Sequence, residues 1–199
     1  GTRTSILHLS TEDEVSLVRQ AKKQGLPVYA EVTPHHLFLN QESYNKLGNK
    51  VKVNPPLREE KDQEALWKGV HEGVIDYIGT DHAPHTSLEK SLNYAQAPAG
   101  IPSIELLLPL LMTAVDQGRI NLETLVKITR TNIEKIFRLK EQTDFILVDP
   151  SYSKKFKDEE LKTKCQWSPY SDRMLKGKVA YVFIRDKLFQ MDKLALCPS

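Results

Sequence analysis

The feature that most constrains the fold is a regular alternation of strand-like and helix-like segments in the first two thirds of the chain. Strands are predicted at residues 5–9, 27–32 and 75–80, and helices at residues 12–24, 60–72 and 103–115. Such alternation is typical of parallel strands joined by crossover helices, either in a barrel or in a doubly wound sheet. Because three strands cannot close a barrel, we expect an open sheet or a part of a larger one.

Local signals indicate where these elements begin and end. Thr11 and Glu14 form a capping-box pattern at the start of the first helix. Asn121 and Thr131 are predicted to cap two further short helices. The proline-containing passage from residue 33 to residue 59 shows no clear period, so we expect it to be irregular.

The character of the chain changes after residue 140. Residues 145–148 and 178–184 read as strands without a helix pattern between them, and a charged stretch at residues 154–164 lies in the interval. We therefore predict two units, an α/β unit over residues 1–140 and a small β-rich appendage over residues 141–199.

Composition argues against several classes of protein. The chain has 199 residues, of which 40% are hydrophobic and 27% are charged, as in ordinary globular proteins. A net charge of +2 without a Lys/Arg block argues against a nucleic-acid partner. Cys165 and Cys197 are too few for a disulfide framework, and no run of roughly eighteen apolar residues indicates a membrane span. We therefore expect a cytoplasmic protein that does not bind a membrane.

Polar side chains gather where the predicted strands end. The residues are His8 after the first strand, Glu31, Thr33 and His35 around the end of the second, and Asp81, His82 and His85 after the third. The carboxyl ends of parallel strands are where α/β proteins build their sites. Imidazole and carboxylate groups suit an open catalytic zinc site, and a carboxylate beside the reacting water can carry a proton. The plainer alternative for the stretch from Asp81 to His85 is a polar loop with an Asp-initiated turn.

Some of these residues have a simpler explanation. A single strand-end histidine such as His8 is more often a satisfied polar residue than a metal ligand. Side chains of adjacent residues on an extended chain point to opposite faces, so for His35 and His36 we favour packing, or support of a neighbouring metal ligand, over joint metal binding. Trp167 is interpreted as a packing residue of the appendage.

Five motifs, in order, carry a resemblance to a known family. They are H-L-S-T at residues 8–11, A-E-V-T-P-H-H-L at 30–37, V-N-P-P-L-R at 53–58, T-D-H-A-P-H at 80–85 and A-P-A-G at 97–100. With them the chain resembles the C-terminal half of a dihydroorotase, a member of the amidohydrolase superfamily. The resemblance implies the C-terminal part of a (β/α)8 TIM-type barrel over residues 1–140 and part of a composite β-sandwich over residues 141–199.

The resemblance also implies an activity, the reversible zinc-dependent interconversion of L-dihydroorotate and N-carbamoyl-L-aspartate in pyrimidine synthesis. By this resemblance His8 and Asp81 are metal ligands, Asp81 is also the general acid/base, and His82 shapes the turn. The implied substrate-binding residues are Asn54, His85, Ala97 and Gly100. Further expectations are two Zn²⁺ ions in a complete site, a homodimer, and association with aspartate transcarbamoylase.

The match to the family is incomplete. The family's His-x-His motif, its bridging Lys or Asp and a further histidine are absent, and two protein ligands are too few for a zinc site. The connection at residues 140–144 is also shorter than in the family. Both departures are expected if segments of a longer enzyme lie outside this sequence. Two alternatives stay open: a hydantoinase or allantoinase acting on a related cyclic amide, and a non-catalytic dihydroorotase-like subunit that supports aspartate transcarbamoylase.

Overall fold

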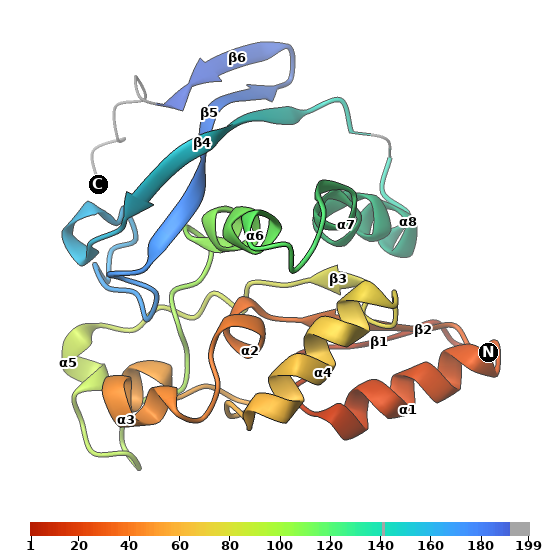
Figure 1. Cartoon of the computed structure of the whole chain (residues 1–199), viewed down its shortest axis with the longest axis horizontal. Coiled ribbons are helices and arrows are strands. Elements are labelled where there is room, and N and C mark those ends of the chain that lie inside the picture. The colour runs from red at the N-terminus through yellow and green to blue at the C-terminus, as the bar shows by residue number, and fades with distance from the viewer. Residues whose placement is uncertain (141, 192–199) are drawn as a thin grey trace.

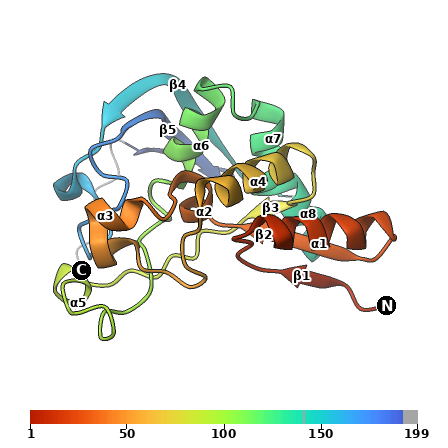
Figure 2. The ribbon, with the colours of Figure 1, turned by 60° about the horizontal axis from the view of Figure 1, so that its bottom comes forward.

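The computed structural model describes residues 1–140 and 142–191 and has the predicted α/β architecture (Figure 1). Three short parallel strands form the first sheet in the order β1 (Thr4–Ile6), β2 (Val28–Val32) and β3 (Tyr77–Ile78). Figure 2 shows β1 at the rim of the molecule beside the N-terminus, so this edge of the sheet is open within the part of the chain that the structure describes.

Two strands of this sheet are shorter than the sequence predicts. Strand β1 ends at Ile6, before His8, and β3 ends at Ile78, before Asp81. His8 has a φ of 58° and Asp81 a φ of 42°, which is the left-handed region that extended strands cannot contain. The polar residue that follows each strand therefore also helps to end it.

Helices α1 (Glu12–Lys23) and α4 (Glu60–His71) lie side by side and cover the first sheet (Figure 1). The predicted capping box at the start of α1 is confirmed, because the Thr11 side chain accepts from the Glu14 N–H while the Glu14 carboxylate accepts from the Thr11 N–H. A Cβ on Gly69 would meet Val15 and Ile75 at 3.1 Å, so glycine lets α4 approach its neighbours closely.

The prediction that residues 33–59 are irregular is wrong. This passage contains two single-turn helices, α2 (Pro34–Phe38) and α3 (Ser43–Leu47), and the 3₁₀ turn η1 (Gly48–Val51). Helices of five residues are too short to show a hydrophobic period. The expectation that His35 and His36 stand on extended chain is therefore also wrong, because both lie in α2, where Thr33 caps the helix and Pro34 begins it.

The later helices follow the predicted order with shifted limits. After the short helix α5 (Ser87–Lys90), α6 runs over Leu107–Asp116 and begins later than predicted, because turns occupy residues 104–106. Asn121 caps α7 (Leu122–Val126) through its side chain, as predicted. Thr131 does not cap a helix, because the π-helical turn η2 (Lys127–Thr131) joins α7 to α8 (Asn132–Phe137) without a break.

A second, antiparallel sheet contains β4 (Phe145–Lys155), β5 (Met174–Ile184) and β6 (Lys187–Gln190), and the 3₁₀ turn η3 (Asp158–Glu160) lies between β4 and β5. This confirms the two predicted strands and adds β6. Helix α6 packs against β5, where Gly177 faces Met112 so closely that a Cβ would meet its side chain at 2.6 Å. The antiparallel sheet therefore packs on the α/β part through α6.

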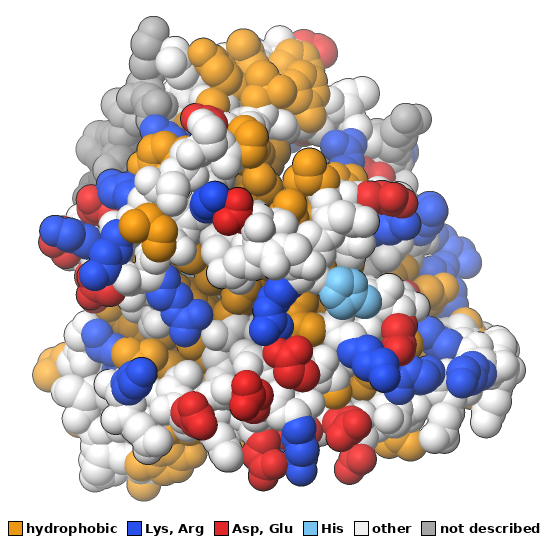
Figure 3. Space-filling model, in the orientation of Figure 1, with side chains coloured by type: hydrophobic (Ala, Val, Ile, Leu, Met, Phe, Trp, Pro, Cys, Tyr) orange, Lys and Arg blue, Asp and Glu red, His pale blue; other side chains and the backbone are white. Residues whose placement is uncertain are grey.

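One region of the antiparallel sheet leaves apolar side chains exposed, visible at the top of Figure 3. The exposed residues are Phe145, Ile146, Leu147, Ile184, Leu188 and Phe189. In the described part of the chain no helix has the length and apolar character needed to cross a membrane. Cys165 is a free thiol, and Cys197 lies outside the described residues.

Candidate active site

The first feature of the candidate site is a histidine–carboxylate pair at the ends of β1 and β2. His8 Nδ1 lies 2.8 Å from Glu31 Oε1, and Glu31 is 8% exposed. Burial raises the pKa of Glu31, and the neighbouring His8 partly offsets that rise. An imidazole whose Nδ1–H faces a carboxylate has its Nε2 lone pair left for a metal ion, which is the usual support for a histidine ligand.

The second feature is Asp81, which follows β3 and faces a buried histidine. His35 Nε2 lies 4.0 Å from Asp81 Oδ2, the His35 side chain is 0% exposed, and neither of its ring nitrogens has a hydrogen-bond partner among the described residues. Burial, helped by His36 and His8, holds the pKa of His35 well below its ordinary value, so its ring is neutral at pH 7. A buried imidazole without partners is costly, which marks this position as part of a site.

His36 supports the site through backbone contacts. Its Nε2 lies 3.1 Å from the Pro55 carbonyl oxygen, so Nε2 carries the proton, and its Nδ1 accepts from the Thr33 hydroxyl at 2.7 Å. The bond to Pro55 ties helix α2 to the segment that contains Asn54 and Pro55, and the bond to Thr33, the N-cap of α2, fixes the ring. The rings of His35 and His36 are buried and their centres lie 4.5 Å apart, which agrees with a packing role, and His35 also faces Asp81, as a residue that supports a metal ligand would.

The buried state of His36 gives a testable pH dependence. Burial lowers the pKa of His36 from 6.5 to about 4, so the unfolded chain binds this proton between those values and the folded chain does not. The free energy of unfolding should thus fall by up to about 3 kcal/mol as the pH drops from 6.5 to 4. We expect His36→Gln, measured by urea unfolding, to lose less stability over this window than the wild type. Parallel losses in both proteins would contradict this assignment.

The remaining histidines of the motif hold the loop around it. His82 Nδ1 accepts from the N–H groups of Ser103 and Ile104 at 3.0 and 3.2 Å, which fixes the start of the segment that leads to α6. His85 Nε2 donates to the Ala99 carbonyl oxygen at 3.2 Å. His82 therefore has the turn-shaping contacts expected of it, and His85 contacts the loop at residues 97–100.

The loop at residues 97–100 has most of its backbone groups already paired. The Ala97 N–H donates to Asn93 O at 2.8 Å, and the Gly100 N–H donates to Lys52 O at 2.9 Å. Gly100 has a φ of 144°, and a Cβ there would meet the Ala83 carbonyl oxygen at 2.5 Å, so only glycine fits. Within the described residues the Ala99 N–H alone, among the three N–H groups of this loop, has no hydrogen-bond partner.

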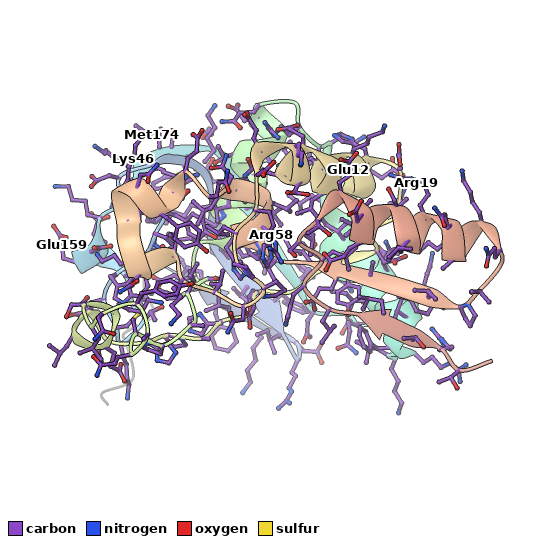
Figure 4. All side chains as sticks on the ribbon, turned by 90° about the horizontal axis from the view of Figure 1, so that it is seen from below. Glu12, Arg19, Lys46, Arg58, Glu159 and Met174 are labelled. Carbon is purple, nitrogen blue, oxygen red and sulfur yellow. The ribbon has the colours of Figure 1, made fainter. Side chains whose placement is uncertain are left out.

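Asn54 is a predicted site residue without a hydrogen bond to the strand-end pairs among the described residues. It is exposed. Nearby, Arg58 lies between the α3 segment and α1 (Figure 4) and lines a polar hollow with Thr11, Glu12, Gln41 and Asp62. That hollow does not include the strand-end residues His8 and Asp81.

The side chains at the strand ends fit a metal ion by type but not by number. His8, Glu31, His35 and Asp81 provide imidazole and carboxylate groups, which suit zinc. Within the described ranges, however, no group of three or more such residues is arranged to hold a metal ion. A complete zinc site therefore needs ligands besides those that this chain brings together.

Sequence reasoning missed three residues that shape this region. Glu31 lies at a strand end in the sequence, but its short contact to His8 depends on the fold. Lys90 has three backbone carbonyl partners, and the Trp167 indole donates to the His85 carbonyl oxygen at 2.7 Å. No sequence pattern marks these contacts, because they join segments that are distant along the chain.

Comparison with known proteins supports the resemblance, although no family model matches the chain. The dihydroorotase of Carboxydothermus hydrogenoformans is 44% identical over 186 residues, covering 89% of this chain and 43% of that protein. Among solved structures, the L-hydantoinase (dihydropyrimidinase) of Arthrobacter aurescens superposes with a TM-score of 0.91 at 26% identity, covering 99% of this chain and 47% of that one. The chain therefore spans less than half the length of either protein.

A third similar protein bears on the question of activity. The inactive dihydroorotase-like domain of a Chaetomium thermophilum CAD-like multifunctional protein superposes with a TM-score of 0.72 at 27% identity, covering 94% of this chain and 50% of that one. Of these three proteins the dihydroorotase has the highest sequence identity to the chain, and the fold is shared with the hydantoinase. These similarities confirm that the chain is a relative of the dihydroorotases of the amidohydrolase superfamily.

Proposed function

We propose that this chain forms part of a dihydroorotase, which opens and closes the ring between L-dihydroorotate and N-carbamoyl-L-aspartate. The observation that carries the proposal is the meeting of the pairs His8–Glu31 and His35–Asp81 at the carboxyl ends of three parallel strands. In this proposal residues 1–140 are the C-terminal part of a (β/α)8 barrel, and residues 141–199 are part of a β-sandwich. The open edge at β1 supports the first assignment, since a barrel continues there.

The roles of the residues follow from their positions. His8 and Asp81 would hold zinc, with two ions in a complete site, and zinc would polarise the cyclic amide carbonyl and activate water. Asp81 would accept the proton of the attacking water and return it to the leaving ring nitrogen. The further zinc ligands would come from segments outside this sequence.

The proposed substrate-binding residues are Asn54, His85, Ala97 and Gly100. His85 can approach a substrate carboxylate from the loop that it already contacts through Ala99 O. Ala97 and Gly100 would shape the pocket, since their N–H groups are hydrogen-bonded within the protein. We also propose a homodimer that works beside aspartate transcarbamoylase, as the family resemblance implies.

A substrate panel tests the proposed reaction. Purified protein, loaded with Zn²⁺, is assayed with L-dihydroorotate, hydantoin, dihydrouracil and allantoin under the same conditions. We expect the highest kcat/KM for L-dihydroorotate, because the sequence identity to a dihydroorotase exceeds that to the hydantoinase. A preference for hydantoin or dihydrouracil would instead assign the chain to the hydantoinase reaction.

One observation favours a second candidate, a non-catalytic dihydroorotase-like domain. The inactive dihydroorotase-like domain of the Chaetomium thermophilum protein shares the fold of this chain. The described residues of this chain do not complete a metal site. The retention of His8 in contact with Glu31, and of Asp81 at 4.0 Å from His35, argues against loss of function. Protein that binds aspartate transcarbamoylase, contains no zinc and turns over none of the panel would support this second candidate.

A further inference from the structure

A buried lysine binds the loop that contains two of the proposed substrate-binding residues. Lys90, the last residue of α5, is 3% exposed. Its Nζ lies 2.9 Å from Pro98 O, 2.9 Å from Gly100 O and 3.2 Å from Lys52 O. An ammonium group has three N–H donors, so these three main-chain carbonyl groups occupy all of them.

A second lysine and a histidine bind the same loop. Lys52 Nζ donates to Ala97 O at 2.7 Å and to Tyr94 O at 2.6 Å, and it lies 4.4 Å from the centre of the Tyr94 ring. His85 donates to Ala99 O. Each of the four carbonyl groups from residue 97 to residue 100 therefore accepts a hydrogen bond from a side chain.

The energetics of Lys90 argue for a role other than general stability. Lys90 has no carboxylate partner among the described residues, and burying an ammonium group without one costs free energy. Even a buried charge that has an ionic partner is weak evidence for stability, because apolar side chains often replace such a pair without loss. Burial and the charge of Lys52 lower the pKa of Lys90 to about 8, so the three-donor ammonium form still predominates at pH 7. The ammonium group of Lys90 instead fixes the orientation of the three carbonyl groups to which it donates.

Trp167, from the second half of the chain, contacts both His85 and Lys90. It is 1% exposed, its indole donates to His85 O, and Lys90 Nζ lies 6.0 Å from its ring centre. The ring shields the lysine from water and fixes the backbone of His85. The contacts therefore join the loop, the D-H-A-P-H motif and the appendage in one unit.

We propose that Lys90 and Lys52 are positioning residues, which hold the loop at residues 97–100 in the orientation that binds the substrate. By directing the carbonyl groups into the protein they leave the Ala99 N–H as the free donor of the loop within the described residues. The inference rests on the proposed function for the identity of the substrate. The binding of the loop by the two lysines does not depend on it.

The test compares Lys90→Met and Lys52→Met with a matched control, Lys50→Met. Lys50 lies in the same region, 5.5 Å from the Trp167 ring centre, but makes no hydrogen bond to the loop among the described residues. Two quantities are measured in the full-length protein: amide hydrogen exchange in peptides that cover residues 93–101, and KM and kcat for L-dihydroorotate. Lys52→Arg, which keeps a cationic donor, tests rescue.

In Lys90→Met and Lys52→Met we expect faster amide hydrogen exchange confined to residues 93–101. We also expect a KM raised about tenfold or more and a smaller change in kcat. Lys52→Arg should recover part of the KM loss, and Lys50→Met should resemble the wild type. If Lys90→Met does not fold, the proposal is tested with Lys52→Met alone, because Lys52 is partly exposed and its replacement should not prevent folding.

Three results would overturn the proposal: unchanged exchange in the loop, faster exchange with an unchanged KM, or equal loosening of the whole chain. The last result would mean that the lysines support only the fold. Absence of dihydroorotate turnover in the wild type would refute the proposed function instead. The exchange measurement, which needs no substrate, would then still decide whether the lysines hold the loop.

Discussion

Replacing Asp81 with asparagine is expected to lower the kcat for L-dihydroorotate by about 10²- to 10⁴-fold, the usual contribution of a general acid/base. The amide has nearly the shape of the carboxylate but cannot accept the proton of the attacking water. Asparagine also tolerates the left-handed backbone at this position, where φ is 42°, so the fold should persist. The measurement is steady-state turnover in both reaction directions, with circular dichroism as a check of folding.

A matched control for this variant is Asp172→Asn. Asp172 also has a positive φ, 65°, and its carboxylate pairs with Lys155 at the surface, away from the strand ends. The control should retain wild-type turnover, since an exposed ion pair contributes little. Wild-type turnover in Asp81→Asn itself would remove Asp81 from the catalytic role.

The second large effect is expected from His8→Asn. Asparagine accepts the left-handed conformation of His8, where φ is 58°, but it removes the imidazole that Glu31 supports. We expect a fall in zinc affinity at least as large as the 10- to 100-fold typical of losing a group that orients a ligand. Zinc content after dialysis against a graded chelator measures this directly and needs no turnover.

Two comparisons make this test specific. Glu31→Gln should lower zinc affinity by about 10- to 100-fold, less than His8→Asn, because it removes the support and keeps the ligand. His71→Asn changes an exposed histidine at the end of α4 and should leave zinc affinity unaltered. Equal zinc affinity in the wild type and His8→Asn would show that His8 does not bind the metal.

The sequence was sufficient to predict the main elements of the fold. The hydrophobic patterns of α1 and α4, the capping box at Thr11 and the parallel pairing of the three strands were confirmed. The errors occurred where tertiary contacts decide the local structure. Helix α2 has five residues, too few for a period, and the Thr131 position continues a helix because a π-helical turn joins α7 to α8.

The candidate site was predicted less completely than the fold. Parallel strands bring their carboxyl ends to one edge, so topology predicts that His8, Glu31 and Asp81 lie at the same edge. Which side chains pair there, His8 with Glu31 and His35 with Asp81, depends on the fold. The orientation of His35 could not be predicted, because its helix was not recognised. The buried position of Lys90 was equally hidden, since lysine is almost never fully buried without a paired charge and no sequence pattern marks the exception.

The most direct test of the proposed function is the turnover of L-dihydroorotate by protein purified from its native source, with the intact mass measured on the same sample. We predict ring opening to N-carbamoyl-L-aspartate, lost on chelation and restored by Zn²⁺, in protein whose mass exceeds the 22.7 kDa of this sequence. Zinc-loaded protein of such larger mass that converts no dihydroorotate in either direction would contradict the assignment of this chain to a catalytic dihydroorotase.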